Sequence, residues 1–249
     1  MANIGTVYYD ASSLPIREDI IFAHQRAWKR LSRPGTWWSG AQRVSIATEA
    51  RHANNCGSCR KLQSALTPEA VSDEHDSLGH LPAPVVEAIH RIWVDASRLT
   101  GRWYEKLISS GLADGEYVEI VGIVATVIAV DTFTHALGLT PHPLPFPEGG
   151  QPSRLRPPGA KAGLAWVPTV SPEDVTDTEL GLYSNSSGAH IRRALSLVPD
   201  EAIGFFDLDE AHYLPYTAVR DFGYEYRAIS HAQIELLAAR VSALNKCFY

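Results

Sequence analysis

Residues 39–66 read SGAQRVSIATEARHANNCGSCRKLQSAL and combine a helical pattern with a Cys-x-x-Cys pair, Cys56 and Cys59. Read as one helix with about 3.6 residues per turn, the stretch places Glu49, His52 and both cysteines on one face. Two thiols at this spacing can close a disulfide, and a neighbouring base promotes the reactive thiolate. The stretch therefore predicts a dithiol site that is assisted by a carboxylate and an imidazole.

A second interpretation of the same stretch begins from the dipeptide Asn54-Asn55, which favours a helix break directly before Cys56. A new helix starting at that point has Cys56 and Cys59 in its first turn. Free backbone N–H groups and the helix dipole stabilise a thiolate there. Both interpretations lead to the same two sulfurs.

The composition is that of an ordinary globular protein, with 249 residues, 45% apolar and 20% charged residues, and a net charge of −6. No basic stretch stands out, so we expect no nucleic-acid partner and no anionic membrane surface. The first residues show no signal-peptide pattern, and three cysteines give no secreted disulfide framework. We therefore expect a cytoplasmic protein. The apolar run 120–130 is too short to span a bilayer and is typical of a buried helix.

Helical periodicity dominates the chain and predicts an all-α fold. We also expect that the protein uses no cofactor. The expected helices are Pro15–Leu31, Gln42–Asn54, Pro82–Ala96, Arg102–Leu112, Glu116–Leu137, Gly188–Leu197, Glu210–Arg220 and Ser230–Lys246. Nine of the sixteen prolines lie between Pro141 and Pro172, where the periodicity stops. We therefore predict a helical unit at 1–139, a proline-rich linker or arm at 140–180, and a second helical half-unit at 181–249.

The chain also shows a partial internal repeat. HAQIELLAARVSALNKC, residues 231–247, aligns without gaps on GAQRVSIATEARHANNC, residues 40–56. The identical pairs are Ala41/Ala232, Gln42/Gln233, Ala47/Ala238, Asn54/Asn245 and Cys56/Cys247. Two copies of one helix–thiol unit imply pseudo-symmetry or a duplicated half-domain.

A glutamate followed at a fixed distance by Cys-x-x-Cys, at the end of an apolar helix, resembles the alkylhydroperoxidase D and carboxymuconolactone decarboxylase family. The run from Glu235 to Cys247 matches the first half of that motif, and residues 110–139 resemble a further helix of the peroxidase-related members. The chain is most similar to the relatives in which selenocysteine can replace a motif cysteine. The resemblance implies an alkylhydroperoxidase D-like helical bundle that is oligomeric, most simply a homo-oligomer.

Neither copy of the motif is complete. In the first copy, Val44 stands at the glutamate position and Gln63 at the histidine position, and Glu49 and His52 are candidates to replace them. In the second copy, the sequence stops at Tyr249, one residue before the second thiol is expected. A selenocysteine codon read as a stop would give this pattern, and we state it as a hypothesis.

The resemblance implies a peroxidase-like thiol oxidoreductase with a small hydroperoxide as substrate. Cys59 is expected to attack the peroxide as a thiolate and Cys56 to close the disulfide, which an external dithiol reductant reopens. Glu49 and His52 are the expected acid–base groups. Glu235 and Cys247 are the expected catalytic groups of the second copy.

Two other functions remain open. The pattern Cys56-x2-Cys59-x15-His75-x4-His80 lies within the ligand spacing of a Cys2His2 zinc site. The acidic chain argues against a DNA-reading finger, so a structural zinc is the form this function would take. The third candidate is a non-catalytic helical oligomer that keeps the fold without the chemistry.

Overall fold

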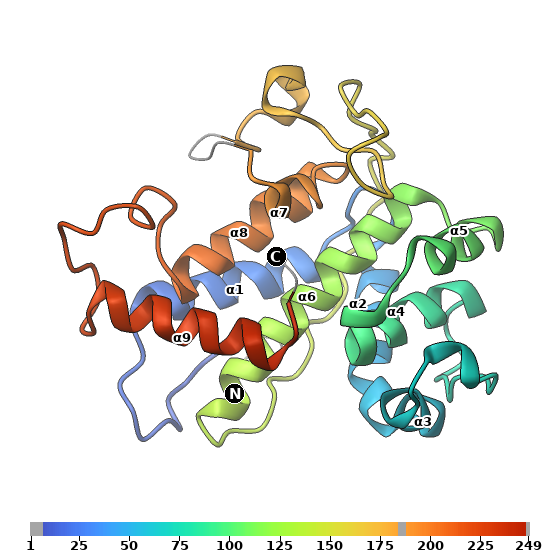
Figure 1. The fold of residues 1–249 in the computed structure, drawn as a ribbon, viewed down its shortest axis with the longest axis horizontal. Helices are drawn as coiled ribbons and strands as arrows, with labels where there is room; N and C mark the ends of the chain where they lie inside the picture. The colour runs from blue at the N-terminus through green and yellow to red at the C-terminus, as the bar shows by residue number, and fades with distance from the viewer. Residues whose placement is uncertain (1–6, 184–187, 248–249) are drawn as a thin grey trace.

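The computed structural model describes residues 7–183 and 188–247, and within them the protein is all-helical, as predicted (Figure 1). These residues form nine α-helices and no strand, apart from one isolated bridge between Lys161 and Thr169. The helices are α1 (Glu18–Ser32), α2 (Gly40–His52), α3 (Gly57–Ser64), α4 (Ala83–Asp95), α5 (Gly101–Ser109), α6 (Asp114–Ala136), α7 (His190–Arg193), α8 (Pro199–His212) and α9 (His231–Leu244).

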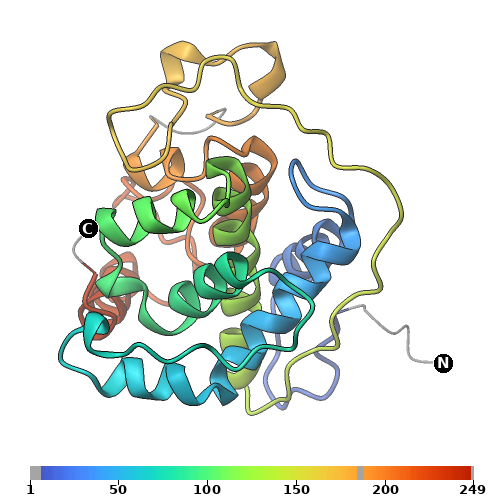
Figure 2. The same cartoon turned by 90° about the vertical axis from the view of Figure 1, so that its right-hand side faces the viewer.

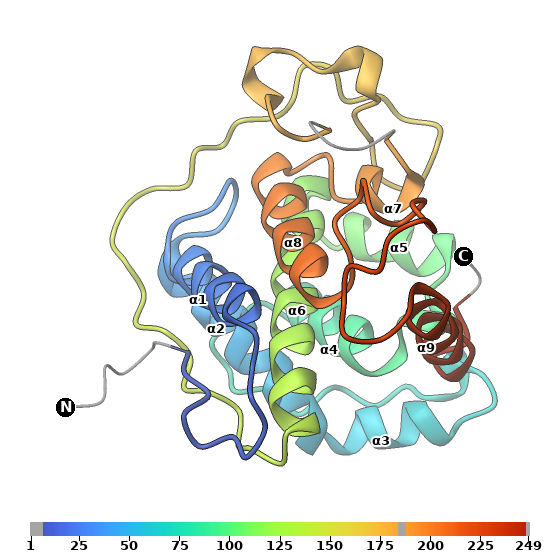
Figure 3. The same ribbon diagram turned by 90° about the vertical axis from the view of Figure 1, so that its left-hand side faces the viewer.

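Helix α6 is the centre of the fold. It packs against α2, α4, α8 and α1, with α2 and α4 on one side of it in Figure 1 and α1 and α8 on the other, and Figure 3 shows α6 in the middle of the helices. Its buried apolar residues, among them Ile120, Ile123 and Val127, are 0–1% exposed. By length and composition α6 could cross a membrane, but 67% of its apolar window is buried inside the protein. It is therefore a core helix, in agreement with the prediction for residues 120–130.

An ion cluster interrupts this apolar core. Arg43 of α2 forms ion pairs with Glu119 of α6 and with Glu201 of α8, and all three side chains are at most 2% exposed. Buried charges of this kind require partners, because the desolvation of an unpaired charge is large. The cluster therefore fixes how α2 and α8 sit on α6. The surrounding helices bring Gly122 so close to Glu201 that an added Cβ would lie 2.7 Å from its carboxylate.

The predicted helix Glu210–Arg220 is wrong in its position. Helix α8 begins at Pro199, which suits a first helical turn because it has no N–H to satisfy, and ends at His212. Pro215 disfavours helical backbone at the residue before it, so residues 213–215 are irregular and residues 216–220 form turns. The other predicted helices are present, with ends that differ by a few residues and with the predicted helix Gly188–Leu197 reduced to the short α7.

The proline-rich segment runs as an extended arm along the outside of the helices (Figure 2). Its backbone N–H groups at Glu148 and Arg154 donate to the carbonyls of Ser32 and Thr36, at 2.7 and 2.8 Å. Further along, Val167 and Val170 are buried in the same apolar core as α2, α4 and α6. The arm is thus attached along its length by hydrogen bonds and by apolar contacts.

The two halves of the sequence repeat share a helix start. Ser39 and Ser230 each cap a helix, and the side chains of Gln42 and Gln233 accept a hydrogen bond from the backbone N–H of the capping serine. This capping box explains the shared glutamine. The halves then differ, because α2 is a core helix, whereas α9 buries only His231 and Ile234.

Candidate metal centre

The Cys-x-x-Cys pair lies at a helix start, and the continuous helix of the first interpretation is wrong. Helix α2 ends at His52, a 3-10 turn covers Ala53–Asn55, and α3 begins at Gly57. Cys56 is the N-cap of α3, and its Sγ accepts a hydrogen bond from the backbone N–H of Cys59 at 3.4 Å. The break predicted at Asn54-Asn55 is confirmed, and both sulfurs lie at the positive end of a helix.

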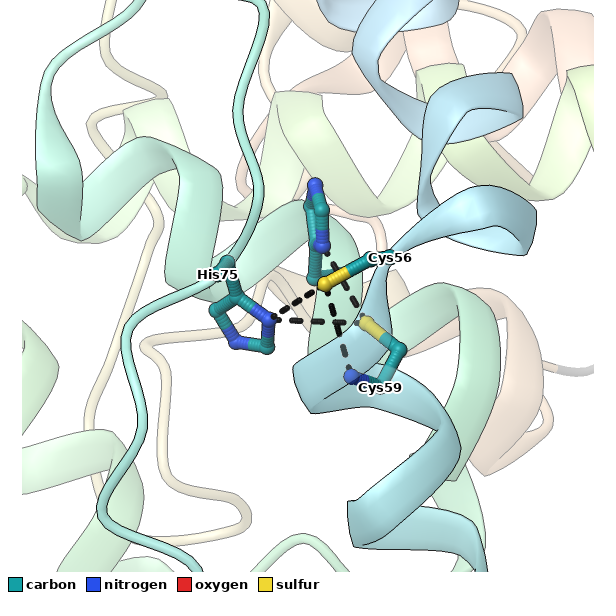
Figure 4. Close-up of side chains that lie close together, drawn as sticks. Cys56, Cys59 and His75 are labelled. Atoms are coloured by element: carbon teal, nitrogen blue, oxygen red, sulfur yellow. Dashed lines mark hydrogen bonds between the residues drawn. The ribbon is translucent and has the colours of Figure 1, made fainter.

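Two imidazoles face the two sulfurs. The Nδ1 atom of His75 lies 3.6 Å from Sγ of Cys56 and 3.4 Å from Sγ of Cys59 (Figure 4). The Nδ1 atom of His90, from α4, lies 3.2 Å from Sγ of Cys59. All four atoms lie within 4.8 Å of one another. The cysteines and His90 are at most 1% exposed, so the cluster is closed to solvent on most sides.

These separations fit a tetrahedral metal site. With Zn–S bonds of about 2.3 Å and Zn–N bonds of about 2.0–2.1 Å, tetrahedral geometry separates a sulfur ligand from a nitrogen ligand by about 3.6 Å. The three sulfur–nitrogen contacts of 3.2–3.6 Å are close to this edge length. The cluster has the size of a cation-centred tetrahedron.

A carboxylate fixes each imidazole from behind. The Nε2 atom of His90 lies 3.0 Å from Oε1 of Glu49, and the Nε2 atom of His75 lies 3.0 Å from Oε2 of Glu87. A carboxylate accepts, so each Nε2 carries the proton and donates it. A neutral ring then turns a free Nδ1 lone pair toward the sulfurs, whereas a protonated His75 donates its Nδ1–H to Cys56. Metal-binding histidines are commonly oriented in this way.

An irregular segment closes the cluster. Residues 72–80 have no regular secondary structure, yet the backbone N–H of Asp76 donates to Sγ of Cys56 at 3.3 Å. The side chain of Asp76 accepts from the N–H of Gly57 at 2.6 Å. The N–H of Leu78 donates to Oε2 of Glu49 at 3.2 Å. These contacts place His75 over the start of α3.

The electrostatics differ between the two thiols. Burial raises the pKa of Cys56, but hydrogen bonds from the Cys59 and Asp76 N–H groups and from His75 outweigh burial and bring it below its ordinary value. For Cys59, burial and the neighbouring Cys56 raise the pKa. Burial also lowers the pKa of His90, which keeps its ring neutral, as a metal ligand must be. A divalent cation between the sulfurs would stabilise both thiolates.

The structure brings some of the predicted site residues together and separates others. Cys56, Cys59 and His75 meet, as the zinc pattern requires, but His80 is exposed and His90 takes the fourth position. Glu49 reaches the sulfurs only through His90. His52 is half-buried, and its ring lies 6.5 Å from that of His90.

The second motif copy lies elsewhere. Figure 1 shows α9 and α3 on opposite sides of α6. Glu235 accepts a hydrogen bond from the hydroxyl of Tyr213 and pairs with His231 at 3.3 Å. Cys247 is an exposed free thiol. Neither residue contacts the first copy's sulfurs.

Sequence reasoning missed His90 and Glu87. His90 lies 31 residues after Cys59, outside the spacing of short zinc motifs, on a helix that was predicted for its apolar face. The available signal was a histidine among the buried positions of that helix, three residues after a glutamate. Only the packing of α4 against α2 and α3 brings it to the cysteines.

Comparison with known proteins does not place the chain in a family. No family model matches it, and no curated protein or solved structure matches it significantly. The likeness to the alkylhydroperoxidase D family therefore stays a prediction from short motifs.

Proposed function

We propose that this chain is a zinc-binding helical protein in which Cys56, Cys59, His75 and His90 hold one Zn²⁺. The observation that carries the proposal is the orientation of the two imidazoles. Each donates its Nε2–H to a carboxylate and, when neutral, turns its Nδ1 lone pair toward sulfur, His75 toward both cysteines and His90 toward Cys59. Neutral thiols could donate S–H hydrogen bonds to these lone pairs, and once the thiols are deprotonated the arrangement provides four electron-pair donors for a cation.

The donor set favours zinc among the common metals. Two sulfurs and two nitrogens in tetrahedral array select Zn²⁺ over the harder ions Mg²⁺ and Ca²⁺, which prefer oxygen ligands. Two thiolates and two neutral imidazoles also balance the charge of one divalent cation. Since the protein supplies all four ligands, the metal would have a structural role. It would join the start of α3, the irregular segment 72–80 and α4.

Metal analysis of the purified protein tests this proposal. We expect one zinc per chain, and loss of at least about nine-tenths of it in Cys59→Ser, because a structural site needs all four ligands. Cys247→Ser is the matched control, since it removes an exposed thiol outside the cluster and should leave the zinc content unchanged. A parent protein without zinc after growth and refolding in zinc-containing medium would contradict the proposal.

A second candidate is reduction of hydroperoxides by the same cysteines. It is supported by the lowered pKa of Cys56, whose Sγ accepts two backbone N–H bonds. This favours Cys56, rather than Cys59, as the attacking thiolate. Cys56 would take the terminal oxygen of the peroxide and release an alcohol. Cys59 would then attack the sulfenic acid and release water, and an external dithiol would reduce the disulfide.

The two candidates differ in how zinc affects the thiols. In the zinc protein, bound metal blocks the sulfurs, so hydroperoxide should oxidise the metal-free form faster than the loaded form. In a peroxidase, the metal-free protein should consume hydroperoxide repeatedly in the presence of dithiothreitol, and Cys56→Ser should abolish turnover. Single oxidation without turnover would leave the structural zinc proposal standing and reject the peroxidase.

A further inference from the structure

We propose that the pocket between α4, α5 and residues 68–73 is a binding site for a small organic anion that carries an apolar group. The pocket has a volume of about 830 Å³, within the range of about 300–1,000 Å³ that is typical of small-molecule sites. Its walls include Val71, Glu87, Arg91, Arg102, Trp103 and Lys106. Nothing in the proposed zinc function requires this pocket.

Helix α5 supplies unpaired positive charge. Arg102 and Lys106 stand four residues apart, so they share the helix face that lines the pocket. Both are exposed, and neither forms an ion pair with any residue that the structure describes. The chain as a whole carries a net charge of −6, so two unpaired positive side chains at one pocket differ in sign from the protein's overall charge. An anion is the ligand that this wall attracts.

The opposite wall contains a buried donor without an acceptor. The side chain of Arg91 is only 8% exposed, and its Nη atoms pair with Asp95 at 3.2 Å and with Glu87 at 3.7 Å. Its Nε–H has no hydrogen-bond partner in the described part of the chain. A buried polar group without a partner loses its hydration and gains nothing in return. Arg91 also lines the pocket, so its guanidinium adds to the positive charge at this wall.

Most of the pocket's acidic groups are already engaged. Glu87 accepts from the indole N–H of Trp103 at 2.7 Å and from His75 at 3.0 Å, and Asp73 forms an ion pair with Lys61. Of the acidic wall residues, Glu69 has no ion pair in the described residues, and it is exposed. With Arg102 and Lys106 against Glu69, the sum of the free charges that face a ligand is therefore positive.

The aromatic part of the pocket indicates the rest of the ligand. Trp103 lies under the Arg91 guanidinium, 5.6 Å from ring to charge, and Val71, Pro84 and Leu107 add apolar surface. A bare inorganic anion would leave this surface uncovered. A carboxylate or phosphate ester with a short alkyl or aryl group would use both parts of the pocket.

Titration with phenyl phosphate and hexanoate tests the proposal, with benzyl alcohol and hexanol as uncharged controls. The readout is the indole N–H resonance of Trp103, assigned with Trp103→Phe. We expect both anions to shift this resonance and the alcohols to bind at least about tenfold more weakly, because the charge contacts are lost. Zinc content is measured for every variant, so failure here is distinguishable from failure of the metal proposal.

Charge-matched variants sharpen the test. Arg102→Gln/Lys106→Gln should raise the dissociation constant of phenyl phosphate at least about tenfold. Lys29→Gln/Arg240→Gln removes the same charge from exposed sites elsewhere and should leave it within about twofold. Arg91→Lys keeps the charge but removes the planar guanidinium beside Trp103 and should weaken binding at least about threefold. Equal binding of anions and alcohols, or equal losses in both double variants, would overturn the proposal.

Discussion

Two histidine clusters in this molecule differ in what lies behind the rings. At His75 and His90, each Nε2 meets a carboxylate and each Nδ1 meets sulfur. In the second cluster, between α1, α6 and α8, the ring of His24 is hydrogen-bonded to neither a carboxylate nor a thiol in the described residues. There His24 bonds to the Tyr9 hydroxyl at 2.6 Å through Nδ1 and faces Nε2 of His212 at 2.5 Å through Nε2. Buried histidines alone therefore do not make a metal site.

His24 is the ring at the centre of the second cluster. Both ring nitrogens of His24 have partners, and Tyr9 passes the hydrogen-bond chain on to Thr134 at 3.2 Å. Burial, followed by the neighbouring His212 and His142, lowers the pKa of His24 to about 3. The ring is held neutral as a packing element beside Phe133. The clusters thus differ in the groups around the rings. Carboxylates at His75 and His90 hold the Nε2 protons, and the two sulfurs can balance the charge of a cation.

The largest effect expected from this difference is the response of stability to zinc. At free zinc about 1,000-fold above the dissociation constant, a site present only in the folded state adds about 4 kcal/mol. For a chain of this length we expect Tm to rise by roughly 8–16 °C, at about 2–4 °C per kcal/mol. His90→Ala should lose this zinc-dependent rise, which thermal unfolding with and without a chelator measures.

His80→Ala is the matched control, because His80 fits the sequence spacing but is exposed in the structure. It should keep the whole zinc-dependent rise in Tm. If His80→Ala lost the rise and His90→Ala kept it, the fourth zinc ligand would be His80, as the sequence spacing predicts. The ligand set with His90 would then be wrong.

The same pair of histidines shows how far the sequence leads. Local signals predicted the all-α class, most helix positions, the break before Cys56, and the grouping of Cys56, Cys59 and His75. His80 was chosen because it is near in sequence. His90 enters through the packing of α4 on α2 and α3, and the Glu49–His90 contact spans 41 residues. Contacts of this kind depend on tertiary geometry, which periodicity and spacing do not contain.

The second cluster should make stability depend on pH. Because the pKa of His24 is about 3 in the folded protein and about 6.5 when unfolded, the unfolded chain binds more protons below pH 6.5. The stability contribution is fully present above pH 6.5 and falls, as pH decreases, by up to about 1.4 kcal/mol per pH unit.

Urea unfolding of metal-free protein between pH 7.5 and 4.5 measures this slope. Compared with the parent, His24→Gln should reduce the slope of unfolding free energy against pH by up to about 1.4 kcal/mol per pH unit. His80→Gln is the control at an exposed ring and should leave the slope unchanged. An identical slope in the parent and in His24→Gln would show that His24 titrates normally in the folded protein. The cluster would then lose its contrast with the zinc site.

The smallest effect concerns the acids behind the metal ligands. Glu49→Gln should weaken zinc binding by about 10–100-fold, because losing such a partner lowers the basicity and the orientation of the ligating ring. Glu87→Gln should have a smaller effect, since Glu87 is 38% exposed and Glu49 1%. Glu235→Gln, far from the cluster, is the control and should bind zinc like the parent. Competition with a chromophoric chelator gives all three affinities. Equal affinities for Glu49→Gln and Glu235→Gln would mean that the sulfurs alone decide binding, and the carboxylates would then explain nothing about the difference between the two histidine clusters.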